Sequence, residues 1–179
     1  MICILNVFII GDINDRSLSD FFIDRLKNNF SVTYINNNLI KKVGNGNEIL
    51  LFENENLICD NLKDSIIIFK KNCLPEISGS FNKNNTAIIY SPEKEQLKML
   101  CKKNITTITC GGSPKDTITY SSINEDSVVV SLQREVSSIK GNSILPFEIP
   151  IKVSECDIYN ILSYFALSVK IDCTEKNYL

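Results

Sequence analysis

The pattern of hydrophobic and polar positions begins with a continuous apolar run. Residues 3–10 are apolar except Asn6, which predicts a strand buried on both faces, as in a parallel sheet. Apolar residues then recur at helical spacing over about 17–28, where Ser17 or Ser19 is in position to cap a helix. The chain therefore opens with a strand, a turn that starts at Gly11, and an amphipathic helix.

The middle of the chain continues the alternation of strands and helices. Strands are predicted over 30–35, 49–52 (a short strand or hairpin arm after a turn at 44–46), 64–70, 86–91 and 105–112. Residues 71–85 read as a loop, and a helix is predicted from Pro92 to about residue 104, with acids in its first turn and lysines in its last.

After residue 112 the pattern changes. Three strand-like runs over 116–123, 126–136 and 144–153 predict an antiparallel meander, in which Pro150 suits an edge strand. A last helix is predicted over about 155–169. This order predicts one α/β domain over 1–179, with a three-layer, mainly parallel, Rossmann-like or P-loop-like sheet and the antiparallel meander in its C-terminal half.

The amino-acid composition limits the kinds of catalytic and metal site that the chain can contain. The chain has no His, which excludes His-dependent nucleophilic catalysis and His metal ligands, and its seven cysteines are scattered without a C-x-x-C pair. We therefore expect reduced thiols in a cytoplasmic protein, with no metal site. A net charge of −2 favours neither nucleic acid nor anionic lipid, and no apolar stretch approaches the ~20 residues of a membrane span.

The first turn, "GDINDRS", stands where a phosphate-binding loop would lie. Gly11 opens it, Arg16 stands in place of the phosphate-binding Lys, and Ser17 matches the Ser or Thr that holds Mg²⁺. However, Asp15 replaces the second Gly and Asp12 adds another negative charge. A structural corner is the first interpretation, and residual anion binding by Arg16 and Ser17 at the helix N-terminus is the alternative.

The chain as a whole resembles the central, ATP-binding domain of the Mur ligases. In that family the first turn is T-G-x-N-G-K-T/S, which Gly11, Asn14, Arg16 and Ser17 match with one extra residue; "DSIIIFK" and the closing helix "VSECDIYNILSYFALSVKI" resemble later segments. The resemblance implies an ATP and Mg²⁺ site, with Asn160 at the position that contacts adenine.

The departures from the family pattern bear on activity. The Lys of the phosphate loop is absent, and the family's Mg²⁺-binding Glu has only loose candidates in Glu53 and Glu55. Acyl phosphate formation needs the Lys, Mg²⁺ and acidic ligands together. We therefore expect no catalytic residues and no cofactor, with ATP and Mg²⁺ only if the degenerate site still binds them.

Two further regions are candidates for function. Cys110, Gly111, Gly112 and Lys115 follow a predicted buried strand, where they either line a ligand crevice, with Cys110 as a reactive thiol, or form a tight turn. Tyr159 and Tyr164 on the last helix either pack on the sheet or contribute to a subunit contact.

These observations lead to two functional hypotheses, beside a third possibility, a thiol-dependent redox function at Cys110. The first is a non-catalytic binding or assembly module of Mur-ligase central-domain type, with a homodimer as one form of assembly and its partner unknown. The second is a small enzyme or nucleotide or anion sensor that uses a crevice formed by Arg16, Ser17, Lys115 and Asn160.

Overall fold

The computed structural model describes residues 4–124, 126–152 and 156–173. Its elements are β1 (Leu5–Ile10), α1 (Ser17–Leu26), β2 (Phe30–Ile35), β3 (Ile40–Val43), β4 (Asn47–Asn54), β5 (Leu57–Leu62), β6 (Ser65–Phe69), β7 (Ile77–Phe81), β8 (Thr86–Tyr90), α2 (Lys94–Lys102), β9 (Thr106–Cys110), β10 (Ile118–Ile123), β11 (Ser127–Leu132), β12 (Val136–Ser137), β13 (Ser143–Ile144), β14 (Phe147–Lys152) and α3 (Ile158–Lys170). Residues 3, 153 and 155, at the ends of predicted elements, lie outside the described residues.

A ten-stranded sheet in the order β14-β11-β10-β9-β8-β6-β1-β4-β2-β3 forms the centre of the fold. The strands from β9 to β2 in this order pair in parallel. At one side β10, β11 and β14 pair antiparallel, and Pro150 lies on the edge strand β14. This arrangement confirms the predicted α/β class, with its mainly parallel sheet and antiparallel meander.

Some elements differ from the sequence prediction. The strand predicted over 49–52 is longer, spans Asn47–Asn54 as β4, and inserts in parallel between β1 and β2. The predicted loop over 71–85 contains β7, which pairs in parallel with β5 in a separate two-stranded sheet. The burial of β5 and β7 is partial and their sequences are polar, so periodicity gives little signal for them.

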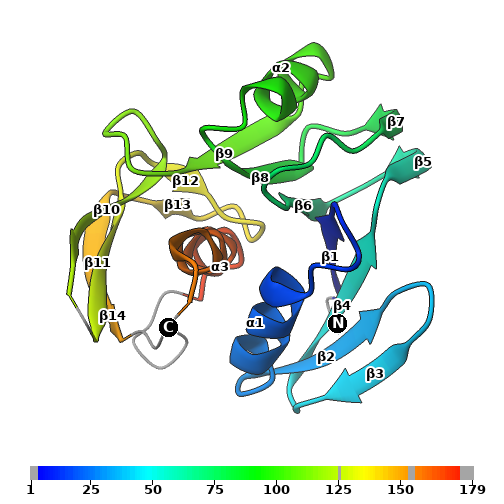
Figure 1. Ribbon diagram of the computed structural model, residues 1–179, viewed down its shortest axis with the longest axis horizontal. Helices are drawn as coiled ribbons and strands as arrows, with labels where there is room; N and C mark the ends of the chain where they lie inside the picture. The colour runs from blue at the N-terminus through cyan, green and yellow to red at the C-terminus, as the bar shows by residue number, and fades with distance from the viewer. Residues whose placement is uncertain (1–3, 125, 153–155, 174–179) are drawn as a thin grey trace.

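The sheet is covered on both faces, as the three-layer prediction requires. Helices α1 and α3 lie within the concave side of the curved sheet, whereas α2 and the β5–β7 pair lie on its outer side (Figure 1). Each side has its own buried hydrophobic cluster, and the larger is the one that contains α3. No helix in the described part of the chain is long and apolar enough to cross a membrane.

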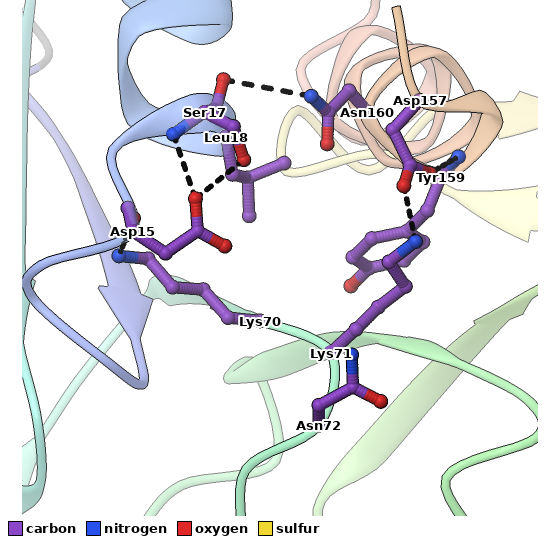
Figure 2. Close-up of a pocket in the computed structure, with 9 residues that line it drawn as sticks. All are labelled: Asp15, Ser17, Leu18, Lys70, Lys71, Asn72, Asp157, Tyr159 and Asn160. Atoms are coloured by element: carbon purple, nitrogen blue, oxygen red, sulfur yellow. Dashed lines mark hydrogen bonds and ion pairs between the residues drawn. The ribbon is translucent and has the colours of Figure 1, made fainter.

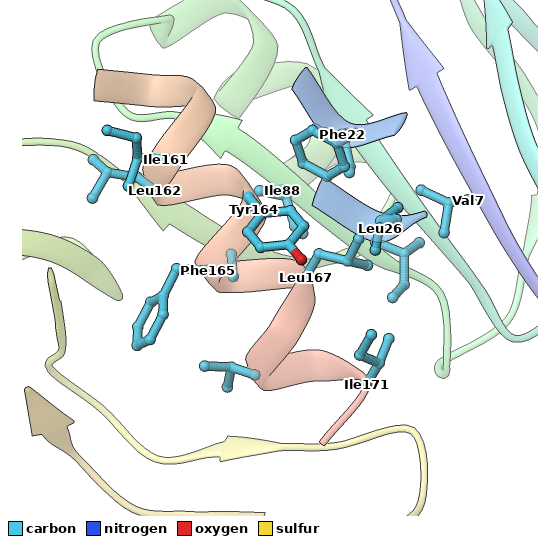
Figure 3. Packing of buried hydrophobic residues seen from close by; sticks show 14 of the residues in the cluster. Val7, Phe22, Leu26, Ile88, Ile161, Leu162, Tyr164, Phe165, Leu167 and Ile171 are labelled. Atoms are coloured by element: carbon cyan, nitrogen blue, oxygen red, sulfur yellow. The ribbon is translucent and has the colours of Figure 1, made fainter. Parts of the chain in front are cut away.

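Helix α3 is buried almost all round, because it packs against α1 as well as the sheet (Figure 3). Tyr164 contacts Phe22 of α1 with ring centroids 5.5 Å apart. Tyr159 donates a hydrogen bond to the Phe69 carbonyl at 2.5 Å. Both tyrosines are at most 4% exposed, so the interpretation of Tyr159 and Tyr164 as a subunit contact is wrong, and they belong to the core.

The parallel strands end at one edge of the sheet, which positions the candidate site. The loops that follow β1, β6, β8 and β9 gather at this edge, together with the N-terminal ends of α1 and α3. In open α/β sheets this edge is where ligands bind.

Candidate functional site

The β1–α1 loop, residues 11–16, occupies the place of a phosphate-binding loop, but amides at this loop donate hydrogen bonds to the loop's own carboxylates. The Asn14 amide donates to the Asp12 carboxylate at 2.9 Å, and the Ser17 amide and hydroxyl donate to the Asp15 carboxylate at 3.0 and 2.7 Å. The prediction that Ser17 or Ser19 caps α1 is wrong. The Ser17 amide in the first turn donates instead to the Asp15 carboxylate. These hydrogen bonds also lower the pKa of Asp15, which keeps a negative charge at the helix N-terminus.

Lys70 occupies the space that the loop encloses. It follows the last residue of β6, and its ammonium donates to the backbone carbonyls of Asp12 and Asp15, both at 2.5 Å. Its Nζ also lies 2.6 Å from Oε1 of Glu53 on β4. The side chains of Lys70 and Glu53 are only 3% and 0% exposed, so this is a buried ion pair.

The order of the strands explains how these residues meet. Because β1 lies between β6 and β4, the Lys70 side chain crosses the end of β1 to reach Glu53. Gly11 leaves room for this crossing. Its φ is +142°, and an added Cβ would lie 2.8 Å from both Lys70 Cβ and Cys73 Sγ.

Tyr34 on β2 is a third side chain in this buried polar cluster, beside Lys70 and Glu53. Its hydroxyl donates to Oε2 of Glu53 and accepts a hydrogen bond from the Asn36 amide at 2.8 Å. Burial, reinforced by the negative charge of Glu53, raises the pKa of Tyr34 to about 12. Arg16 turns away from the loop interior, because its guanidinium pairs with Asp20 at 2.8 Å and lies 5.3 Å from the centre of the Tyr34 ring.

A polar cavity of about 210 Å³ lies between the N-terminal ends of α1 and α3 (Figure 2). It is lined by Asp15, Ser17, Leu18, Lys70, Lys71, Asn72, Asp157, Tyr159 and Asn160. Lys71 pairs with Asp157, and Asp157 caps α3 by accepting from the Tyr159 amide at 2.8 Å. Each lysine that lines the cavity is thus already paired with a carboxylate of the same chain.

The predicted nucleotide-site residues are therefore only partly brought together. Ser17 and Asn160 line the same cavity, where the Asn160 amide approaches the Ser17 carbonyl at 3.5 Å. Gly11 and Asn14 belong to the loop wall, and Arg16 points to Asp20.

The second predicted group lies elsewhere on the same edge. Cys110 is fully buried, and burial, with the charge of Asp116, raises the pKa of its thiol well above the ordinary value. Gly111 and Gly112 form a turn in which the Asp116 carboxylate accepts from Ser91 and Ser113.

The positions of the other predicted crevice residues are as follows. Lys115 is exposed, and its carbonyl accepts from Arg134 at 2.7 Å. None of Cys110, Gly111, Gly112 and Lys115 lines the cavity described above. Burial of Cys110 and the raised pKa of its thiol oppose a reactive thiol, whereas a ligand crevice beside Gly111, Gly112 and Lys115 stays a prediction.

The residues at the β1–α1 loop do not fit ATP and Mg²⁺, which the family resemblance implies. The loop directs carbonyl oxygens, not amides, at its centre, and that centre holds an ammonium. Glu53, the better placed candidate for a Mg²⁺ ligand, is matched by Lys70, and Glu55 is exposed. A triphosphate at this loop would face Asp12 and Asp15, and the two lysines that line the adjacent cavity in the described part of the chain, Lys70 and Lys71, are already paired with carboxylates.

Sequence reasoning missed Lys70, Lys71 and Asp157 as members of the site. The available signal was a pair of lysines directly after the fully buried strand "SIIIF", at the edge where ligands bind. Glu53 was considered only as a metal ligand, because periodicity does not show which charge another strand supplies.

Comparisons with known proteins show a likeness of fold. No protein-family model and no curated protein matches the sequence. Among solved structures, MurF ligase from Thermotoga maritima in complex with ADP aligns with 95% of this chain at a TM-score of 0.55 and 14% identity. A UDP-N-acetylmuramate:L-alanyl-gamma-D-glutamyl-meso-diaminopimelate ligase from Neisseria meningitides aligns with 98% of the chain at a TM-score of 0.48 and 9% identity.

The match with MurF ligase concerns the fold alone. This chain spans 46%, about half, of the MurF ligase chain and 62% of the Neisseria ligase chain. The chain therefore has a mainly parallel α/β fold similar to part of a Mur ligase, as the sequence resemblance predicted.

Proposed function

We propose that this protein is a non-catalytic, cytoplasmic binding or assembly module with a Mur-ligase-like fold and without an ATP site. One observation supports this proposal above the others: the Lys70 ammonium fills the β1–α1 loop and pairs with the buried Glu53. Ligase chemistry needs a lysine and a metal that both act on phosphate, and here the corresponding space is occupied from within the chain.

The energetics oppose exchange of Lys70 for a nucleotide. Withdrawing the ammonium would leave the Glu53 carboxylate buried and uncompensated, which typically costs about 3–5 kcal/mol. The incoming phosphates would add negative charge beside Glu53, Asp12 and Asp15. Binding energy from the rest of the nucleotide would have to offset both terms.

Calorimetric titration of the protein with ATP and ADP, with and without Mg²⁺, tests the proposal. We expect no micromolar binding in either condition. The variant Asp15→Gly restores the glycine of the loop pattern, and it should still not bind because Lys70 remains. Clear Mg²⁺-dependent micromolar binding by the natural sequence would overturn the proposal, and a gain of binding in Asp15→Gly would show that Asp15 alone blocks the site.

A second candidate function is a small-ligand sensor that uses the cavity of Figure 2, because the structure brings Ser17 and Asn160 together there. If this is correct, Asn160→Ala abolishes binding of a ligand found by nucleotide and anion screening, with the melting temperature nearly unchanged. Lys115→Ala is the matched control, since Lys115 lies outside the cavity. Light scattering determines whether assembly includes a homodimer.

A further inference from the structure

Three oxygen atoms, two from the β1–α1 loop and one from β4, converge on one nitrogen. They are the carbonyl oxygens of Asp12 and Asp15 and the carboxylate oxygen of Glu53, at 2.5, 2.5 and 2.6 Å from Lys70 Nζ. An ammonium has three N–H donors, so it can donate to both carbonyls while it pairs by charge with Glu53 Oε1, which accepts no hydrogen bond from any described residue.

We propose that the β1–α1 loop is a binding site for a primary ammonium, and that Lys70 is its built-in ligand. The loop has thereby acquired the opposite charge preference from the phosphate-binding loop it resembles. Carbonyl oxygens and a buried carboxylate favour a cation, whereas the amides that hold a phosphate are here bonded to Asp12 and Asp15.

The backbone around the site is held by contacts that do not involve the Lys70 ammonium. The Gly11 amide donates to the Asn54 carbonyl at 3.0 Å, and the Lys70 amide donates to the Ile10 carbonyl at 2.9 Å. The buried Gln96 side chain donates to the carbonyls of Lys70 and Cys73 at 2.8 and 2.7 Å. We therefore expect the oxygen atoms to keep their places when the Lys70 side chain is truncated.

Chemical rescue of Lys70→Ala tests the inference. n-Propylammonium supplies the three methylene-chain carbons and the nitrogen that this change removes. We expect it to raise the melting temperature of Lys70→Ala by about 3–6 °C at ten times its Kd, and the rise should continue with the logarithm of concentration as for a single binding site. Tetramethylammonium, which has the charge but no N–H donor, should give no such rise at the same concentrations.

Two control variants separate this site from general salt effects. Lys71→Ala removes the neighbouring lysine, whose side chain is 29% exposed, and it should show no rescue by n-propylammonium. In Lys70→Ala combined with Glu53→Gln the carboxylate charge is gone, so the rescue should be lost or much reduced. Equal rescue in all three variants would overturn the inference.

Other outcomes are equally decisive. If inorganic phosphate, rather than the amine, stabilises Lys70→Ala, the loop is an anion cradle and the inference is wrong. If Lys70→Ala does not fold, the readout becomes recovery of folded circular dichroism on adding the amine.

NMR of the natural sequence gives an independent check: the Lys70 ammonium protons should exchange far more slowly than those of exposed lysines, and fast exchange would overturn the inference. These tests are independent of the ATP titration, so the two proposals can fail separately.

Discussion

Lys70 and Lys71 are neighbours in the chain, yet they do different things. Lys70 passes under the β1–α1 loop to a fully buried Glu53, and its own side chain is 3% exposed. Lys71 turns toward the N-terminal end of α3, where it pairs with Asp157 and lies 5.4 Å from the centre of the Tyr90 ring. Side chains at successive positions after a strand point to opposite sides, so one lysine reaches each helix N-terminus.

The difference in burial decides what each ion pair contributes. A carboxylate that has lost its water needs its partner, whereas a half-exposed pair is screened by solvent and contributes little. Lys70 therefore determines the shape and charge preference of the loop, while Lys71 is a surface support for a helix that Asp157 already caps.

The largest effect should come from Lys70→Ala. This change leaves Glu53 buried without a cation and removes the donor for two loop carbonyls. We expect a loss of about 3–5 kcal/mol in the free energy of unfolding, measured by urea denaturation at pH 7.

The matched control is the double variant Lys70→Met with Glu53→Gln, which keeps side-chain volume and removes both charges. It should recover much of the loss, because a neutral pair needs no buried counter-ion. If Lys70→Ala alone proves as stable as the natural sequence, the buried ion pair does not exist in solution.

The next largest effect should come from Gly11→Ala, which tests the crossing of Lys70 over β1. The new methyl group would lie 2.8 Å from Lys70 Cβ and Cys73 Sγ, at a φ of +142° that disfavours side chains. We expect a loss of about 2–4 kcal/mol from overpacking and backbone strain, measured by thermal and urea unfolding. Gly141→Ala is a control for positive φ without crowding, because nothing lies within 4 Å of its added Cβ.

Tyr34→Phe tests the other contact of the buried Glu53 carboxylate, its hydrogen bond from Tyr34. It removes the hydroxyl that donates to Glu53, and we expect a loss of about 1–3 kcal/mol at pH 7. The folded-state pKa of Tyr34 is raised from 10.0 to about 12, so its hydroxyl contributes stability that is fully present below pH 10 and is lost as the pH rises toward 12.

The pH dependence of the free energy of unfolding tests whether the Tyr34 hydroxyl donates to Glu53. Unfolding free energies measured from pH 7 to 12 should fall faster in the natural sequence than in Tyr34→Phe, so that the two curves converge. Parallel curves would mean that the Tyr34 hydroxyl does not donate to Glu53.

The sequence predicted the fold better than the site, for identifiable reasons. The apolar runs that became β1, β6 and β8 are largely buried on both faces, and Leu18, Phe22 and Leu26 mark the inner side of α1, so composition and spacing alone place them. By contrast, β5 and β7 lie at the periphery with polar sequences, and their pairing depends on tertiary contacts.

The site was harder to predict because it depends on which loops meet. The loop pattern led us to expect that Asp15 disfavours phosphate, but it did not show that Lys70, far along the chain, fills the space. The Gly pair after Cys110 indicated either a crevice or a tight turn, and the sequence does not show the Asp116 contacts that stabilise the turn. Spacing locates strand ends, but it does not show which charges will neutralise one another there.

The smallest effects should come from the exposed pair at α3. Asp157→Ala removes the acceptor for the Tyr159 amide, and we expect a loss of about 0.5–2 kcal/mol, typical of a lost helix cap. Lys71→Ala should cost at most about 1 kcal/mol, since Lys71 and Asp157 are 29% and 38% exposed. Urea denaturation at low and high salt measures both, and salt should shrink the difference between Lys71→Ala and the natural sequence. A Lys71→Ala loss as large as that of Lys70→Ala would mean that burial does not separate the two lysines, and the contrast drawn between their sites would fail.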